Sequence, residues 1–328
     1  MARLNIAPIV LLLSVMFVGC NKQNNTEVTE VKVDGSSTVY PIVERMAEKY
    51  NEKFPQERPT IGTSGTGGGF KKFLAGEIDI VTASRPIEEA EIELANKNSI
   101  QFIEIPIAID GLTVVVNKNN TFINEITISD LKKIWKNDSI VKNWSDINPN
   151  YPNSPINLYG PGTDSGTFDY FTKVVNGKEK SSRGDYQASE DDNTLVQGVS
   201  GDKFSMGYFG YAYYEENKST LKALKVYNES LKKYIEPTHE TIKNGEYHPL
   251  SRPLFVYVNK ESLNKLSVQK FVNYILSEGT SYISDVGYVP FDSNVYLVST
   301  DRVVNKVTGS KVHGIEDGSL GSISSAKK

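Results

Sequence analysis

A glycine- and hydroxyl-rich segment at residues 160–171 (GPGTDSGTFDYF) constrains the fold of this chain most strongly. A strand-like run at 156–159 leads into it, and an apolar, helix-compatible run follows. The first turn of a helix offers free N–H groups and a partial positive charge. Ser165 and Thr167 can add hydroxyl donors, and Gly166 lets a ligand approach the backbone. The segment therefore predicts an oxyanion-binding loop at the start of a helix.

The same arrangement occurs twice more in the chain. Residues 34–41 (DGSSTVYP) follow a short strand-like run and precede a helical pattern at 42–50. Residues 64–69 (SGTGGG) precede a second helical pattern, with Lys71 and Lys72 close by. Three helix-opening donor loops indicate a ligand that is small, anionic and contacted from several sides. Phosphate fits that description.

Strand-like runs alternate with helical patterns along the chain, which predicts the α/β class. Strands are expected at 78–82, 100–105, 112–116, 156–159 and 254–258. Helices are expected at 42–50, 87–95, 128–135, 168–175 and 268–275. No tandem repeat with a period of about 20 to 50 residues is present, which argues against a solenoid.

These motifs resemble the PstS family, the phosphate-binding proteins of high-affinity phosphate ABC transporters. The resemblance rests on DGSSTVYP, SGTGGGFKKF, a Ser-Arg-Pro triplet and GPGTDSGTFDYF, and it covers residues 30 to 300 in outline. It continues through residues 191–193, 207–212 and 249–254. It implies a two-lobed type II periplasmic-binding fold with a ligand cleft between the lobes. By the same resemblance, lobe one comprises 31–111 plus 254–313, and lobe two comprises 112–253.

The resemblance and the donor chemistry together select the candidate phosphate ligands. They are Ser37, Thr38, Ser64, Thr66, Ser84, Arg85, Asp110, Asp164, Ser165, Gly166 and Thr167. Not all of them can touch one small anion, and a Ser or Thr before a helix is equally readable as a helix cap. Ser165 and Thr167 are the best supported of the hydroxyls, and Ser36 is the weakest.

Arg85 is expected to supply the main positive charge, because a guanidinium presents a planar fork of donors to two phosphate oxygens. Many members of the family carry an acid at this position and an arginine before their Ser-Gly-Thr motif. This chain has Pro161 and Gly162 in that upstream region. The positive charge that binds phosphate is therefore expected on lobe one, at Arg85, and not on lobe two. The alternative is that Arg85 is a surface or structural arginine.

Selectivity requires a proton acceptor, since monoprotonated phosphate carries a hydrogen that a carboxylate can accept and sulfate carries none. Asp110, at an expected crossing between the lobes, and Asp164, beside Ser165, are the two candidates. The alternative role of Asp110 is to form a turn, and the alternative role of Asp164 is to cap a helix. The acidic residues at 191–193 match a family block but also read as a solvated loop.

The N-terminal segment indicates export. Arg3 precedes an apolar run at 9–18 that is shorter than the roughly 20 residues of a membrane span, and a small residue precedes Cys20. We expect a lipoprotein signal peptide at 1–19, lipidation of Cys20 with an acyl chain such as palmitate, and a polar tether at 20–30. An ordinary signal peptide with an incidental cysteine is the alternative. Cys20 is the single cysteine, so no internal disulfide is possible, and a flexible tail is expected at 314–328.

Composition and motifs exclude several functions. A net charge of -4 gives no basic field, so nucleic acid is not an expected partner. No G-x-S-x-G elbow surrounds the candidate serines, the three histidines form no metal pattern, and no P-loop is present. We therefore expect no catalysis, no cofactor and no metal, and a phosphatase would require an unrecognised nucleophile.

The sequence thus predicts a monomeric, exported, lipid-anchored receptor that delivers inorganic phosphate to the permease subunits of an ABC importer. Sulfate or another tetrahedral oxyanion is the alternative ligand. A surface phosphate sensor or adhesin built on the same fold is the alternative role.

Overall fold

The structure is a computed structural model that describes residues 30–311. The expected signal peptide, Cys20, most of the tether and the tail at 314–328 lie outside these residues. Within the described range, no helix is both long and apolar enough to cross a membrane.

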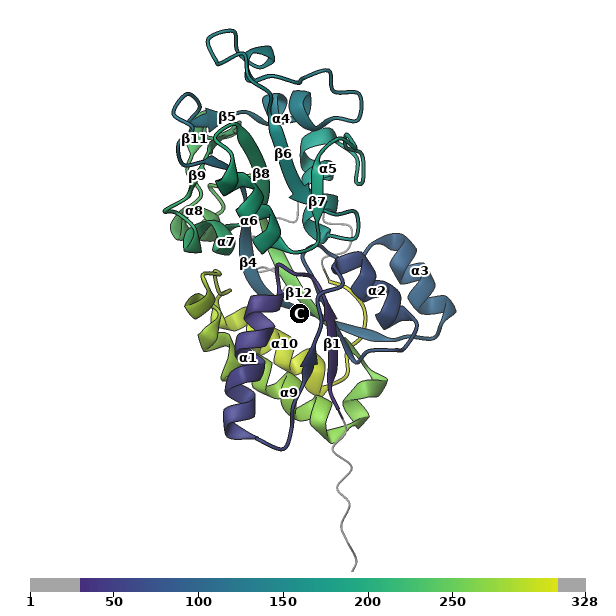
Figure 1. Ribbon diagram of the computed structural model, residues 1–328. Helices are drawn as coiled ribbons and strands as arrows, with labels where there is room; N and C mark the ends of the chain where they lie inside the picture. The colour runs from purple at the N-terminus through teal and green to yellow at the C-terminus, as the bar shows by residue number, and fades with distance from the viewer. Residues whose placement is uncertain (1–29, 312–328) are drawn as a thin grey trace, which may run out of the picture.

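Two lobes are built on one continuous sheet (Figure 1). Its strand order is β2-β1-β3-β12-β4-β8-β6-β7, and β9 pairs additionally with β4. The strands of lobe one are β1 (Lys32–Gly35), β2 (Thr60–Ile61) and β3 (Ile80–Ala83). Those of lobe two are β6 (Asn157–Pro161), β7 (Gln187–Ser189), β8 (Ser205–Gly210) and β9 (Leu221–Ala223). A separate small sheet contains β5 (Glu125–Ile126), β10 (Lys225–Asn228) and β11 (Lys233–Ile235).

Two long strands, β4 (Phe102–Asn117) and β12 (Ser251–Asn259), connect the lobes (Figure 1). Both are buried along their whole length. β4 pairs with β12 through Gly111 and switches to β8 from Leu112 onward. The expected strands at 100–105 and 112–116 are therefore parts of one strand. The intervening residues are mostly apolar, and a register shift between Leu254 and Phe255 lets β12 continue past Pro106.

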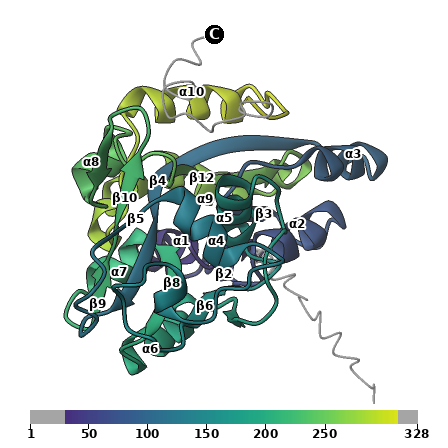
Figure 2. The ribbon, with the colours of Figure 1, turned by 90° about the horizontal axis from the view of Figure 1, so that it is seen from above.

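Helices cover the sheet in both lobes. Lobe one carries α1 (Tyr40–Lys53), α2 (Thr66–Leu74), α3 (Glu89–Lys97), α9 (Leu266–Leu276) and α10 (Ser293–Val304). Lobe two carries α4 (Ile128–Trp135), α5 (Gly166–Asn176), α6 (Asp192–Gly201), α7 (Tyr211–Glu216) and α8 (His239–Lys243). Figure 2 shows α10 lying along one side of the molecule, where it packs against β4 and α9.

Local sequence signals explain where several helices begin. Thr127 accepts a hydrogen bond from the backbone N–H of Asp130 and caps α4, whose bounds match the prediction. Ser165 accepts from the backbone N–H of Thr167 and caps α5. The expected helix at 87–95 begins two residues later, after a capping box between Glu88 and Glu91.

The aromatic segment at 208–214 belongs to the core of lobe two. Tyr208 is fully buried and stacks on Phe171 with ring centroids 3.7 Å apart. Trp135 packs edge-on against both rings. These aromatic contacts support β8 and α5, and α5 carries part of the candidate site.

Candidate functional site

The candidate loops follow the carboxyl ends of parallel strands in both lobes. β1 runs parallel to β2 and β3, and β6 runs parallel to β7 and β8. The loops that follow these strands contain the Ser and Thr residues selected from the sequence. Ligands of open α/β sheets bind at this edge, outside the carboxyl ends of the strands. The strand directions therefore bring the loops of the two lobes to face one another.

Hydroxyl groups from the two lobes meet at this edge. Thr38, in the loop after β1, has its Oγ1 3.0 Å from Oγ1 of Thr167 on α5. Thr66 opens α2, and its Oγ1 lies 3.3 Å from Oγ of Ser84 and accepts from the Ser84 backbone N–H. All four side chains are buried. Threonine and serine hydroxyls from separate loops of the two lobes thus form one cluster.

Gly166 lies where the two lobes approach each other closely. A Cβ atom at this position would lie 2.6 Å from Thr66 Oγ1 and 2.7 Å from Ser84 Oγ. Both contacts are far inside normal van der Waals distance, so only glycine fits while these hydroxyls hold their positions. The first turn of α5 therefore approaches the loops of lobe one through a residue without a side chain.

The buried cation of this cluster is Arg252, on β12. Its Nη2 donates to Thr167 Oγ1 at 2.7 Å, and its Nη1 donates to the Gly166 carbonyl at 3.3 Å. Asp110 Oδ2 accepts from Nε at 3.3 Å and from Nη2 at 3.1 Å, which orients the guanidinium. Sequence reasoning missed Arg252 as a site residue. The signal was present, because Arg252 belongs to the family block at 249–254 and directly precedes the mostly apolar run at 253–258.

Asp192, the first residue of α6, adds a buried carboxyl group. Its Oδ2 accepts from Ser37 Oγ at 3.2 Å across the lobes. Burial raises the pKa of Asp192 to about 7, although the Ser37 hydrogen bond and the charge of Arg252 act in the opposite direction. A carboxyl group with this pKa is present in both its protonated and its ionised form near neutral pH. We refer to Thr38, Thr66, Ser84, Gly166, Thr167, Arg252 and Asp192 as the interlobe cluster.

Arg85 has a different environment from the one expected. Its Nε donates to Asp169 at 2.8 Å, and its two terminal nitrogens donate to both carboxylate oxygens of Glu91 at 2.8 and 2.9 Å. Nη1 also donates to the Pro86 carbonyl, and Nη2 lies 2.9 Å from Glu88 Oε1. A guanidinium has five N–H donors; four of them donate to Asp169, Pro86 and Glu91, and the contact with Glu88 is an ion pair without a hydrogen bond.

The other expected residues divide between structural contacts and the cluster. Ser64 donates through both its backbone N–H and its hydroxyl to Asp34, which fixes the loop before α2. The Ser36 hydroxyl faces the backbone N–H of Val39, so it acts as a local cap. Asp164 is half-exposed and forms an ion pair with Lys71 at 3.0 Å. Ser165 lies beside the cluster, where its hydroxyl caps α5.

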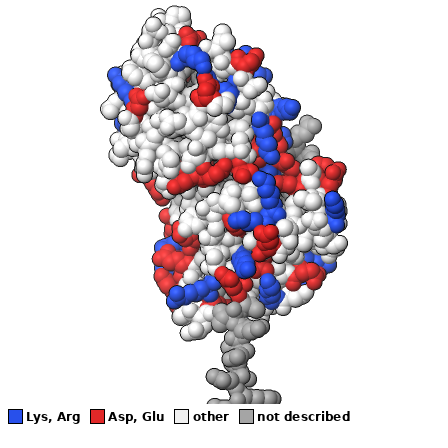
Figure 3. Space-filling view, turned by 45° about the vertical axis from the view of Figure 1, so that its right-hand side comes forward, with Lys and Arg blue, Asp and Glu red and all other residues white. Residues whose placement is uncertain are grey.

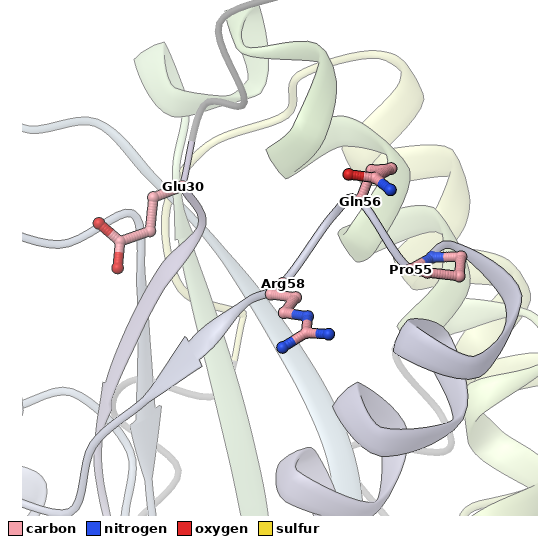
Figure 4. A pocket seen from close by; sticks show the side chains of 4 residues that line it. All are labelled: Glu30, Pro55, Gln56 and Arg58. Carbon is pink, nitrogen blue, oxygen red and sulfur yellow. The ribbon is translucent and has the colours of Figure 1, made fainter.

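Two further features lie outside the interlobe cluster. In residues 30–311, no group of three or more His, Cys, Asp or Glu side chains could hold a metal ion. A surface pocket of about 410 Å³ is lined by Glu30, Pro55, Gln56 and Arg58 (Figure 4). It lies at the amino-terminal end of β1, whereas the cluster lies beyond the carboxyl end. The pocket is therefore separate from the interlobe cluster.

Comparison with known proteins places this geometry in a family. A model of the PBP superfamily domain matches residues 21–279. Protein SphX of Synechococcus elongatus is 48% identical over 286 residues, which cover 87% of this chain and 84% of that protein. The phosphate-binding protein PstS of Staphylococcus saprophyticus is 40% identical over 296 residues, which cover 89% of this chain and 90% of that protein.

Solved structures agree with these relatives. The crystal structure of a possible phosphate-binding protein from Planctomyces limnophilus matches with a TM-score of 0.64 at 48% identity, over 85% of this chain and 98% of that one. A putative phosphate ABC transporter substrate-binding protein from Clostridium perfringens, with bound phosphate, matches with a TM-score of 0.67 at 26% identity, over 80% and 100% of the two chains. The predicted α/β, type II periplasmic-binding fold is confirmed. The chain belongs to the PstS family of phosphate-binding proteins within the PBP superfamily.

Proposed function

We propose that this protein binds inorganic phosphate between its lobes and delivers it to an ABC importer. The observation that carries the proposal is the position of Arg252, a buried guanidinium among hydroxyl groups contributed by both lobes. Relatives that share 40% or more of the sequence over most of its length include a phosphate-binding PstS protein.

The anion ligands in this proposal are Arg252, the hydroxyls of Thr38, Thr66, Ser84 and Thr167, and the backbone at Gly166. Three helices, α1, α2 and α5, begin at these loops and direct free N–H groups and partial positive charge toward the cluster. Neutral hydrogen-bond donors and helix N-termini, together with a single buried cation, can bind a dianion. Arg85 is not among the proposed ligands, because its donors are engaged by carboxylates and a carbonyl.

Asp192 is the proposed acceptor of the phosphate proton. Both oxygens of Asp110 are already used, one by the Tyr211 backbone N–H and the other by Arg252. Asp164 faces Lys71 at the surface. Asp192 is buried, and burial raises its pKa to about 7, so it titrates near neutral pH. At higher pH its carboxylate accepts the hydrogen of monoprotonated phosphate and repels sulfate, which has no hydrogen to offer.

Binding by two lobes also gives the protein a signal that a transporter can read. A ligand that touches Thr38 and Thr66 in one lobe and Gly166 and Thr167 in the other has higher affinity for the closed form. Phosphate therefore shifts the population toward closure, and a permease that accepts the closed form selects loaded protein. The role is binding without catalysis.

Attachment and export are part of the proposal. The resemblance to the family implies an exported binding protein, and the sequence around Cys20 is typical of a lipoprotein signal. We propose that Cys20 carries the lipid and that a monomer works at the outer side of the cell membrane. Mass spectrometry of the N-terminal peptide from the producing cells would detect acylated Cys20; an unmodified peptide that begins elsewhere would refute the anchor.

Calorimetric titration of the refolded protein tests the ligand, because refolding removes any phosphate carried through purification. We expect tight binding of phosphate and little heat with sulfate at a pH of about 8, above the pKa of Asp192. A folded protein that binds neither anion would contradict the proposal and the phosphate-sensor role alike, and would favour the adhesin role. Turnover of a chromogenic phosphate ester would refute the assignment as a binding protein.

A further inference from the structure

We propose that Arg85 is a closure residue: its ion pair with Asp169 joins the two lobes and supports phosphate binding without touching phosphate. The inference rests on the proposed phosphate function. Arg85 follows β3 in lobe one, and Asp169 lies in the first turn of α5 in lobe two. It is thus a positioning residue for binding.

The pair is buried and well aligned. Arg85 Nε lies 2.8 Å from Asp169 Oδ2, and the two side chains are 3% and 1% exposed. Phe70 of lobe one lies under the guanidinium, with 5.5 Å between the guanidinium carbon and the ring centroid. Three further N–H groups donate to Pro86 and Glu91 within lobe one, and Nη2 lies 2.9 Å from Glu88 Oε1. Lobe one therefore holds the guanidinium in place and presents its Nε to the other lobe.

The acidic side chains around Arg85 make the closed arrangement of the lobes sensitive to the loss of its positive charge. Glu88, Glu91 and Asp169 surround Arg85, and a further cation, Lys180, lies 4.0 Å from Glu88. Burial raises the pKa of Asp169 to about 6, against the effect of Arg85. Without Arg85, closing the lobes would bury the Asp169 carboxylate beside two acids. Opening relieves that repulsion because it separates Asp169 from Glu88 and Glu91.

Neighbouring contacts close the same edge of the lobe junction. The Gly67 backbone N–H donates to the Asp164 carbonyl at 2.8 Å, and Lys71 pairs with the Asp164 carboxylate. Figure 3 shows acidic and basic side chains gathered along the junction on the face that carries α2 and α3. The exposed pairs there contribute little because water screens them. The buried Arg85–Asp169 pair is the contact that depends most on a matched charge.

An interlobe contact changes ligand affinity through the closed population alone. Phosphate binds the closed form, so a contact present only in that form contributes to affinity, and its loss speeds dissociation. We expect Arg85→Met to weaken phosphate binding by about five- to 150-fold, the usual range for coupling between sites. The ligand-free variant also has a larger radius of gyration than the wild type. Arg85→Lys keeps the positive charge but lacks the planar set of guanidinium donors. Its phosphate affinity and radius of gyration should lie between those of the wild type and Arg85→Met.

A double-mutant cycle with Asp169→Asn separates closure from general damage to the fold. In the Arg85→Met background, Asp169→Asn removes the uncompensated carboxylate and restores part of the affinity. In the wild-type background, the same change has a smaller effect on affinity than Arg85→Met. Lys53→Met is a control for the loss of a cation, since the exposed Lys53–Glu278 pair lies within lobe one; it leaves affinity unchanged.

The experiment combines phosphate calorimetry, stopped-flow dissociation and small-angle scattering on the wild type and these variants, with circular dichroism to verify folding. Wild-type affinity and compaction in Arg85→Met, or additive effects in the cycle, overturn the inference. If Arg85→Met does not fold, the coupling in phosphate affinity is measured instead with Arg85→Lys and the double variant that combines Arg85→Lys with Asp169→Asn. If the wild type binds no phosphate, the proposed function fails, and the scattering of the ligand-free variants still decides the closure inference.

Discussion

At the scale of single residues, identical side chains have different roles because of their neighbours. Arg85 and Arg252 are both buried. Carboxylates surround Arg85, whereas Arg252 contacts one carboxylate, a hydroxyl and a carbonyl. The sequence favoured Arg85 because it belongs to the Ser-Arg-Pro triplet of the resemblance and its guanidinium suits two phosphate oxygens. Pairing with Asp169, which is 84 residues away, could not be predicted from local pattern, so the assignment of the anion-binding cation depends on tertiary structure.

Gly166 provides a prediction about close approach. Gly166→Ala should lower phosphate affinity by about tenfold or more, since overpacking of about 1–3 kcal/mol falls on the closed form. The melting temperature of the ligand-free protein should change little, because the clash is between lobes. Gly201→Ala is the control, as a methyl group there would meet no neighbouring atom within 4 Å. Equal affinities for the two variants in calorimetry would contradict this explanation of Gly166.

Asp192 provides a prediction about pH. Its pKa of about 7 lies above the ordinary 3.8, so it is protonated below neutral pH and ionised above it. The protonated form donates to a sulfate oxygen, and the ionised form repels it. Sulfate affinity should therefore fall as the pH rises through the pKa of Asp192, by up to about tenfold per pH unit. Competition titrations of phosphate against sulfate on both sides of neutral pH would measure this fall in sulfate affinity.

The Asp192→Asn variant controls for other titrating groups. Asparagine can donate at every pH, so sulfate affinity should become independent of pH and the preference for phosphate should shrink. A sulfate profile that falls equally in the variant and the wild type would assign the pH dependence to another group.

At the scale of elements, the sequence predicted the donor loops and the helices α1 to α5 and α9, because these depend on local signals; α6, α7, α8 and α10 were not predicted. Glycine, hydroxyl residues and apolar spacing mark the start of α5, and Thr127 marks the start of α4. The join of two expected strands into β4 was missed. Pro106 and Gly111 read as interruptions in isolation, and pairing with β12 carries the strand past both.

The cap of α5 can be tested apart from anion binding. Ser165→Ala should lower the free energy of unfolding by about 1 kcal/mol, because the Thr167 N–H loses its acceptor. Thr127→Ala, which removes the cap of α4 away from the cluster, should cost a similar amount and leave phosphate affinity unchanged. Urea denaturation and calorimetry give both quantities. If Ser165→Ala weakens phosphate binding without loss of stability, Ser165 is a ligand instead of a cap.

At the scale of the whole molecule, two buried strands pass from one lobe to the other, and the site loops lie where these strands cross. The lobe limits at 31–111 plus 254–313 and at 112–253 remain predictions. Arg252 and Asp110 lie on the two crossing strands, opposite one another in the β4–β12 pairing. The proposed anion-binding cation therefore belongs to the connection between the lobes, where it can contact a ligand held by both.

The most direct test of the proposed function is phosphate titration of Arg252→Met, with Arg302→Met as a buried arginine control away from the cluster. Arg302 hydrogen bonds to backbone carbonyls in lobe one. We predict that Arg252→Met binds phosphate at least about a hundredfold more weakly, since a charged hydrogen-bonding partner of the anion is lost. The control should keep wild-type affinity if it folds. Wild-type affinity in a folded Arg252→Met protein would contradict the central claim that Arg252 binds the anion.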